Sequence, residues 1–293
     1  MRRWCVAPWR SWRASTCCPP RPTRPAASCR SADLSTTCGA ASQIPRIENM
    51  SKIEITDHGK VRLITINRPE RSNAVDRQAA LDLQAAFKDF EASDMRVAVL
   101  AGAGEKAFSA GADISDPPEI WRIMPTVGFE SEKPIICAVH GWCIGGALMT
   151  MVMSDLCVAD STARFSYPEA RIGVTGGVAA ALAARIPHKI AMELLMMGKP
   201  ISADRALEAG LINQVVEKGK HIDTALEMGQ ELSQMAPMVL RTIKRFVSRT
   251  LPKSPSELML AAQIEIAAIW QSADKKEGEN AFLEKRAPVF VGR

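Results

Sequence analysis

The chain has 293 residues, of which 47% are hydrophobic and 24% are charged, so it is long enough to bury a sizeable core. Its formal net charge of +5 comes from the first 49 residues, which hold eight arginines and only two acids; the rest of the chain has 29 basic and 30 acidic residues. A nearly neutral body argues against nucleic-acid binding, and no apolar run approaches the roughly 18 residues of a membrane span.

The first 49 residues form a segment that differs in composition from the rest. An Arg- and Ser-rich, acid-poor N-terminus is typical of a mitochondrial transit peptide, but five prolines between Pro8 and Pro25 interrupt the helix that such a signal would use. Two interpretations stay open: a transit peptide, with a protein of the mitochondrial matrix, or an upstream extension before a natural start at Met50, with a cytoplasmic protein if the source is bacterial. In both cases we expect residues 1–49 to be a disordered leader or extension.

The cysteines and histidines of the remaining chain do not form a ligand pattern. Its three cysteines lie within apolar runs and make no CxxC pair, so neither a disulfide framework nor a zinc site is expected. The histidines are scattered without the spacing of metal ligands. They are His58, His140, His188 and His221. We therefore expect no metal and no redox cofactor.

Hydrophobic patterns after Met50 first alternate between strand and helix and then become mostly helical. The predicted strands are 52–57, 61–67, 96–100, 135–139 and 213–216, of which the first two form a hairpin. The predicted helices are 76–91, 148–153, 178–185, 189–197, 203–209, 223–235, 237–249, 255–272 and 274–285. Strands with crossover helices, followed by a run of helices, predict a layered α/β core over about residues 50–235 and a helical C-terminal part over about 236–293.

Two segments rich in small residues follow predicted strands and could expose backbone amides. The first runs from Lys106 to Ile114, and the second runs from Gly141 to Ala147, directly into an apolar helix. Amides at a helix N-terminus carry the positive end of the helix dipole, so they suit a developing oxyanion, and each such donor is worth about 3 to 4 kcal/mol. Each segment alone is equally typical of an ordinary tight turn.

In order and spacing, these segments resemble the enoyl-CoA hydratase/isomerase (crotonase) family. The matching stretches are Phe-Ser-Ala-Gly-Ala-Asp-Ile at 108–114, Ala-Val-His-Gly-Trp-Cys-Ile-Gly-Gly at 138–146 and Phe-Ser-Tyr-Pro-Glu at 165–169, and the similarity covers about residues 51–293. The resemblance implies an α/β, crotonase-like (ClpP/crotonase) layered β-sheet core with crossover helices. It also implies an acyl-CoA substrate, as in fatty-acid β-oxidation, no cofactor besides the coenzyme A of that substrate, and a homotrimer or dimer of trimers.

The resemblance further implies which residues form the site. The amides of Ala112 and Gly146 would form an oxyanion hole, and Glu169 would be the acid/base catalyst, with a pKa raised toward neutrality by partial burial among Phe165, Tyr167 and Ile172. The implied substrate and CoA contacts are Arg68, Asn73, Ala74, Ala110, Asp113, Ile114, Ser115, Gly145, Met149 and Lys285. Of these, Arg68 and the loop after it would border the CoA nucleotide, and Lys285 would approach its phosphates.

The chain departs from the hydratase pattern at one catalytic position. That pattern has a glutamate on the helix after the glycines and a second after the proline; the first is Met149 here, and only Glu169 is present. Hydration in the family divides proton transfer between two carboxylates, whereas an isomerase can use one. Hydration and isomerisation both stay open, as do another crotonase-type reaction (dehydration, decarboxylation or thioester hydrolysis) and a catalytically silent CoA-thioester-binding or interaction protein.

The segment 113–133 also differs, because it contains Pro117-Pro118 and is shorter than the family's usual helix over the acyl chain. The acyl chain is therefore not predicted, and Glu119 and Glu130 in this segment are alternative acids. Two other enzyme classes fit less well. Residues 102–104 lack the third glycine of a dinucleotide-binding fingerprint, and residues 107–111 lack the first glycine of a Gly-x-Ser-x-Gly nucleophile turn.

Overall fold

The computed structural model describes residues 52–253, 258, 269 and 271–293. The predicted leader at 1–49, on which the compartment depends, and most of the predicted helix 255–272 lie outside the described residues. No helix in the described part of the chain is long and apolar enough to cross a lipid bilayer.

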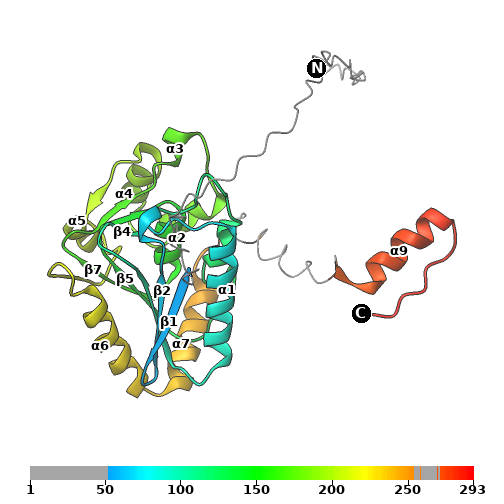
Figure 1. The fold of residues 1–293 in the computed structure, drawn as a ribbon, viewed down its shortest axis with the longest axis horizontal. Coiled ribbons are helices and arrows are strands. Elements are labelled where there is room, and N and C mark those ends of the chain that lie inside the picture. The colour runs from blue at the N-terminus through cyan, green and yellow to red at the C-terminus, as the bar shows by residue number, and fades with distance from the viewer. Residues whose placement is uncertain (1–51, 254–257, 259–268, 270) are drawn as a thin grey trace, which may run out of the picture. The chain divides into compact units, whose positions relative to one another are not determined.

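A sheet of six strands forms the centre of the body, in the order β1-β2-β3-β5-β7-β10 (Figure 1). The strands are β1 (Ile53–His58), β2 (Val61–Ile66), β3 (Val97–Gly102), β5 (Ile135–Val139), β7 (Leu156–Asp160) and β10 (Gln214–Val216). The first two pair antiparallel, as predicted for the hairpin, and all the following neighbours pair parallel. β7 lies in a stretch for which the sequence patterns predicted no strand.

Successive side chains of a strand point to opposite faces of a sheet, so each strand packs against both layers. Different helices cover the two faces of this sheet. Val97 and Val99 of β3 pack in one apolar cluster with Ala225 of α6 (His221–Gln234). Leu100 packs in the other cluster with Phe87 of α1 (Arg77–Ala92) and with side chains of α2 (Gly146–Met153). Figure 1 shows α6 and α1 on opposite sides of the sheet.

A second, four-stranded sheet has the order β4-β6-β8-β9. Its strands are β4 (Ala107–Ser109), β6 (Trp142–Ile144), β8 (Arg164–Ser166) and β9 (Ile201–Ser202). β4, β6 and β8 are parallel neighbours, and they follow β3, β5 and β7 along the chain. Sequence patterns predicted none of these strands, since strands of two or three residues are too short to show an alternation. The second sheet therefore repeats the strand order of the first.

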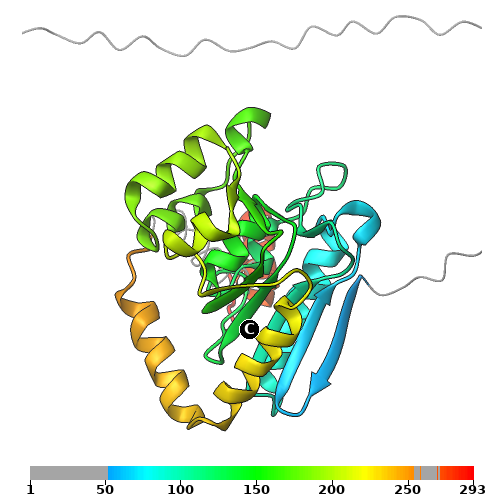
Figure 2. The ribbon, with the colours of Figure 1, turned by 90° about the vertical axis from the view of Figure 1, so that its left-hand side faces the viewer.

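Further helical elements connect and follow these sheets. They are η1 (Pro69–Arg71), η2 (Ile120–Ile123), α3 (Glu169–Ile172), η3 (Gly177–Ala184), α4 (His188–Met192), η4 (Glu193–Met197), α5 (Ala203–Glu208), α7 (Pro237–Thr250) and α9 (Ala273–Glu284). Figure 2 shows α7 continuing the chain from α6.

Two of the predicted helices differ in type. The segment predicted as the helix 178–185 is the 3-10 helix η3, and the predicted helix 189–197 is divided into α4 and the π-helical turn η4. Apolar side chains recur about once per turn in all three helix types, so the spacing alone does not determine which hydrogen bonds form.

Replacement of Phe87 by alanine should lower the free energy of unfolding by about 3 to 5 kcal/mol, because a large buried side chain leaves a cavity. The Phe87 ring is fully buried and stacks on Phe129, with the ring centroids 4.4 Å apart. Urea denaturation of the full chain measures this loss. Leu81→Ala is the control on the same helix, because Leu81 is 45% exposed and its loss should cost little. An equal effect of the two substitutions would contradict the prediction.

Candidate active site

Three parallel, adjacent strands lead into the three segments that carry the predicted catalytic residues. β4 precedes Ala112, β6 ends one residue before the Gly145-Gly146 turn, and β8 ends three residues before Glu169. The carboxyl ends of parallel strands lie at the same edge of a sheet, which is where ligands of α/β proteins commonly bind. The second sheet therefore brings these segments to a common edge.

Glycines allow the first two turns to touch. Gly111 has a φ of 85°, and a Cβ atom built on it would lie 2.7 Å from the carbonyl oxygen of Ile144 and 3.3 Å from the amide nitrogen of Gly146. Such distances leave no room for a side chain, and a positive φ favours glycine. The turn that contains Ala112 thus lies directly against the turn that contains Gly146.

The amides of Ala112 and Gly146 are both available to a ligand. The N–H of Val75 donates to the carbonyl of Gly111, and the N–H of Asp113 donates to the carbonyl of Val75, both at 2.8 Å, so these bonds bypass the N–H of Ala112. Gly146 is the first residue of α2, and no side chain caps that helix start. Within residues 52–253, neither N–H donates to a protein group. Two free donors on touching turns can stabilise an oxyanion.

The carboxylate of Glu169 rests on the same glycine turn. Gly145 has a φ of 58°, and a Cβ atom built on it would lie 2.5 Å from Glu169 Oε1. Glu169 Oε2 is buried and has no hydrogen-bond partner among the described residues. Burial disfavours the charged form and raises the pKa of Glu169 to about 7. Ile172 does not contribute as expected, because its side chain is 55% exposed.

Asn73 supports the site from within the protein. Its side chain is fully buried; Oδ1 accepts the N–H of Arg68 at 3.0 Å, and Nδ2 donates to the carbonyls of Ala103 at 2.8 Å and Ala107 at 2.7 Å. The side chain expected to border CoA is therefore enclosed, and it fixes the loop that carries the partly exposed Ala74.

Asp113 and Arg68 are also engaged inside the protein. The Asp113 carboxylate is buried, and Arg68 pairs with it at 3.3 Å and with Asp76 at 3.0 Å. Hydrogen bonds from the hydroxyl and the amide of Ser115, followed by the neighbouring arginines, lower the pKa of Asp113 to about 2 despite its burial. Arg68 and Asp113 hold the turn after Ala112 in place. Because their charges are already paired with each other and with Asp76, the geometry does not favour direct contact of these charges with a ligand.

Two residues near the site were missed in the sequence. Arg71 is half exposed and donates to the Ser115 hydroxyl at 3.0 Å. Its position three residues after Arg68 could have indicated that it lies near the same turn. Ile120 lies over Gly146, because a methyl group added at Gly146 would overlap its side chain. No local pattern indicates this contact, since Ile120 belongs to the shortened segment 113–133.

The remaining predicted residues occupy different settings. Met149 is buried in the core, Ile114 is 80% exposed, and Ala110 donates its N–H to the carbonyl of Ser72 at 2.9 Å. Lys285 ends α9 in the left-handed conformation with an exposed side chain, and its contact with CoA phosphates stays a prediction. The alternative acids are exposed, and Glu119 pairs with Arg122.

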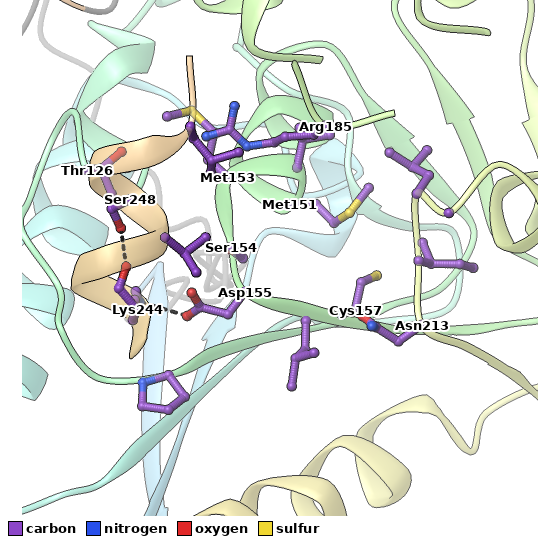
Figure 3. A pocket seen from close by; sticks show the side chains of 18 of the residues that line it. Thr126, Met151, Met153, Ser154, Asp155, Cys157, Arg185, Asn213, Lys244 and Ser248 are labelled. Atoms are coloured by element: carbon purple, nitrogen blue, oxygen red, sulfur yellow. Dashed lines mark hydrogen bonds and ion pairs between the residues drawn. The ribbon is translucent and has the colours of Figure 1, made fainter. Parts of the chain in front are cut away.

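A cavity of about 440 Å³ lies apart from this site, between the end of α2, β7 and α7 (Figure 3). Asp155 and Lys244 form an ion pair at 2.7 Å in its wall. Its lining contains none of the predicted catalytic or substrate-binding residues.

Comparison with known families agrees with the geometry. The protein-family model described as "Enoyl-CoA hydratase/isomerase" matches residues 56–120 and 126–293 of this sequence. The chain belongs to the enoyl-CoA hydratase/isomerase family. It is therefore a crotonase-family enzyme that acts on a CoA thioester. The two matched ranges are interrupted at residues 121–125, within the segment 113–133.

Relatives of this enoyl-CoA hydratase/isomerase family member cover most of its length. The chain is 33% identical over 260 residues to a carnitinyl-CoA dehydratase of Citrobacter koseri, an alignment that spans 82% of this chain and 98% of the relative. A carnitinyl-CoA hydratase structure from Mycobacterium avium superposes with a TM-score of 0.64 and 30% identity, over 83% of this chain and 99% of the other. An enoyl-CoA hydratase from Mycobacterium tuberculosis H37Rv has the same TM-score, identity and coverage. These structures confirm the predicted crotonase fold.

Gly145→Ala should lower kcat/KM of this family member by at least about 100-fold, because the added methyl would displace the Glu169 carboxylate and strain the turn. Steady-state kinetics on an acyl-CoA substrate measures the loss. Gly210→Ala is the matched control: Gly210 has a φ of 69°, yet a Cβ atom there would meet nothing within 4 Å. Backbone strain alone would affect both variants alike, and that result would contradict a specific role of the contact between Gly145 and Glu169.

Proposed function

We propose that the enzyme interconverts a 3-hydroxyacyl-CoA and a 2-enoyl-CoA through a thioester enolate, with Glu169 as the acid/base and the amides of Ala112 and Gly146 as the oxyanion hole. The observation that carries this proposal is the position of the Glu169 carboxylate on Gly145, beside the amide of Gly146. A base and two oxyanion donors at one place are what proton removal next to a thioester carbonyl requires.

In the dehydration direction, the carboxylate of Glu169 takes the proton from the substrate carbon next to the thioester carbonyl. The electron pair moves onto the carbonyl oxygen, which accepts hydrogen bonds from the two amides. When the enolate collapses, a double bond forms between C2 and C3, and the C3 hydroxyl leaves with the proton of Glu169 as water. Because one proton is taken and the same proton is returned, one carboxylate is sufficient in both directions.

The oxyanion hole would supply a large part of the rate. Hydrogen-bond donors that are already in place need no reorganisation as charge develops, and each is worth about 3 to 4 kcal/mol. The Gly111 contact with Gly146 and the buried Asn73 support this rigidity.

The raised pKa of Glu169 suits the proposed proton transfer. A general acid/base works best when its pKa lies near the working pH, and the pKa of about 7 allows Glu169 to hold or release the proton with little cost. No cation pairs with this carboxylate among the described residues, and its Oε2 has no partner to lose.

The relatives named carnitinyl-CoA dehydratase support a reaction in which water leaves or adds. Isomerisation of the double bond is the second candidate. It is favoured by Met149, which is buried in the core at the position where the hydratase pattern has another glutamate. A silent CoA-thioester-binding protein would bind acyl-CoA without any exchange of the C2 proton.

We also propose that the chain forms a homo-oligomer, a trimer or a dimer of trimers. α7 supports this, because several of its large apolar side chains are more than half exposed in the single chain. They are Met238, Val239, Ile243 and Phe246.

An acyl-CoA panel in D2O and H2¹⁸O, analysed by mass spectrometry, tests the reaction. The wild type should incorporate deuterium at C2 and ¹⁸O at C3, and Glu169→Gln should lower both rates by about 10² to 10⁴-fold while acyl-CoA binding is retained, because only the acid/base is removed. Glu119→Gln is the control for loss of an acid and should behave as wild type. Deuterium without ¹⁸O indicates isomerisation, and full turnover by Glu169→Gln would exclude the proposed acid/base.

The pH dependence of kcat/KM should follow the ionisation of Glu169. The reaction begins in both directions with the carboxylate acting as a base, on the C2 proton or on water, so kcat/KM should rise as the pH passes through about 7 and then level off. A pH series of initial rates measures this limb. A profile that is flat between about pH 6 and about pH 8 would be inconsistent with a base of this pKa.

A further inference from the structure

Two histidines that are far apart in the sequence meet at the carboxyl edge of the first sheet. The rings of His140 and His221 lie 4.7 Å apart between centroids, at an interplanar angle of 37°. Both side chains are almost fully buried, as is the carboxylate of Asp160, which lies 3.5 Å from His221 Nδ1. We call these three residues the histidine cluster.

The histidine cluster joins three elements at the carboxyl edge of the first sheet. His140 follows β5, Asp160 ends β7, and His221 is the first residue of α6. Asp160 also accepts the N–H of Gly219 at 3.0 Å, so it holds the connection that leads into α6. Release of this cluster would therefore free the start of α6 from the strands beneath it.

The same cluster is connected to the proposed oxyanion hole. The carbonyl of His140 accepts the N–H of Phe108 in β4 at 2.8 Å. The next residue, Gly141, has no space for a side chain, because a Cβ atom would overlap the carbonyl of Lys106. β6 begins immediately afterwards and leads to Gly146. A shift of His140 would thus move both strands that carry the two amides.

No described interaction fully satisfies the two imidazole rings. Neither ring has a hydrogen-bond partner of ordinary geometry, although Asp160 faces His221 and the backbone of Gly104 faces His140. In residues 52–253, no three His, Cys, Asp or Glu side chains are arranged as a metal-binding group. The geometry leaves protonation as the property that distinguishes this cluster.

Acidic groups from several elements face the rings. Asp160 of β7 and Glu105 of the loop after β3 face His140, and Asp160 and Asp223 of α6 face His221. Lys220, at the start of α6, lies 4.0 Å from Asp223. Burial outweighs these carboxylates and lowers the pKa of both histidines, and each ring, when charged, would also repel the other.

We propose that the histidine cluster is a pH-sensitive positioning device, which holds the start of α6 and strand β6 in place when both rings are neutral and releases them in acid. The effect on Gly146 as an oxyanion donor rests on the proposed function, whereas the release of α6 does not. Because the folded state binds these protons more weakly than the open state, the stabilisation is complete above about pH 6.5 and is lost as the pH falls below that value.

Hydrogen–deuterium exchange of the full chain tests the proposal without a substrate. Between about pH 7.5 and about pH 5.5, after correction for the intrinsic exchange rate, protection of peptides from residues 141–149 and 217–228 should fall about tenfold more than protection of α1. His221→Gln and His140→Gln should each remove most of this extra acid sensitivity. His188→Gln is the matched control, because His188 is exposed on α4, and it should retain the wild-type response.

Equal acid responses of these peptides and α1 in the wild type would overturn the proposal, and so would unchanged responses in both cluster variants. If the variants do not fold, NMR titration of the wild-type histidines decides: transitions of both buried rings below about pH 6.5, together with the loss of protection, support it, and transitions at or above that value overturn it. Glu169→Gln should keep the wild-type exchange pattern. A failure of the proposed catalysis would therefore not be confused with a failure of the cluster.

Discussion

The parallel pairing of β4, β6 and β8 is the constraint on which the candidate site depends. These strands have only three residues each, yet their carboxyl ends place the turns with Ala112, Gly146 and Glu169 at one edge. The turns can approach only because Gly111 and Gly145 lack side chains. The main chain thus positions two backbone donors and a carboxylate without the help of side-chain contacts to a substrate.

Around this edge, buried polar groups are used in two opposite ways. Asp113 is surrounded by donors and arginines, which keep its charge and fix the turn after Ala112. Glu169 is partly buried with little compensation, so its charged form is disfavoured and its pKa is raised. Two carboxyl groups therefore differ because of their surroundings: Asp113 stays charged and supports the turn, whereas Glu169 has a raised pKa. Such shifted pKa values are common at catalytic sites.

Much of the fold, and the segments that meet at the candidate site, could be predicted from the sequence, and what was missed has physical causes. The hairpin and β5 follow from alternating or apolar runs, α1 follows from helical periodicity, and the segments of the candidate site follow from motifs with distinctive glycines. The second sheet is too short to leave a pattern, although it brings the motifs together. The inward position of Asn73, the contact of Ile120 with Gly146 and the meeting of His140 with His221 depend on tertiary packing, which the spacing of residues along the chain does not encode.

The proposed use of amides rather than side chains as oxyanion donors has a consequence for how this enzyme can diversify. The side chain of Ala112 is exposed, and its replacement leaves the N–H of that residue in the backbone. Selection can therefore alter the wall around the acyl group at such positions while the electrostatic centre is inherited unchanged. The glycines are the opposite case, since any mutation at Gly111 or Gly145 alters the spacing of the turns themselves. In the proposed mechanism, substrate range and reaction chemistry are thus encoded at separable positions of the same short loops.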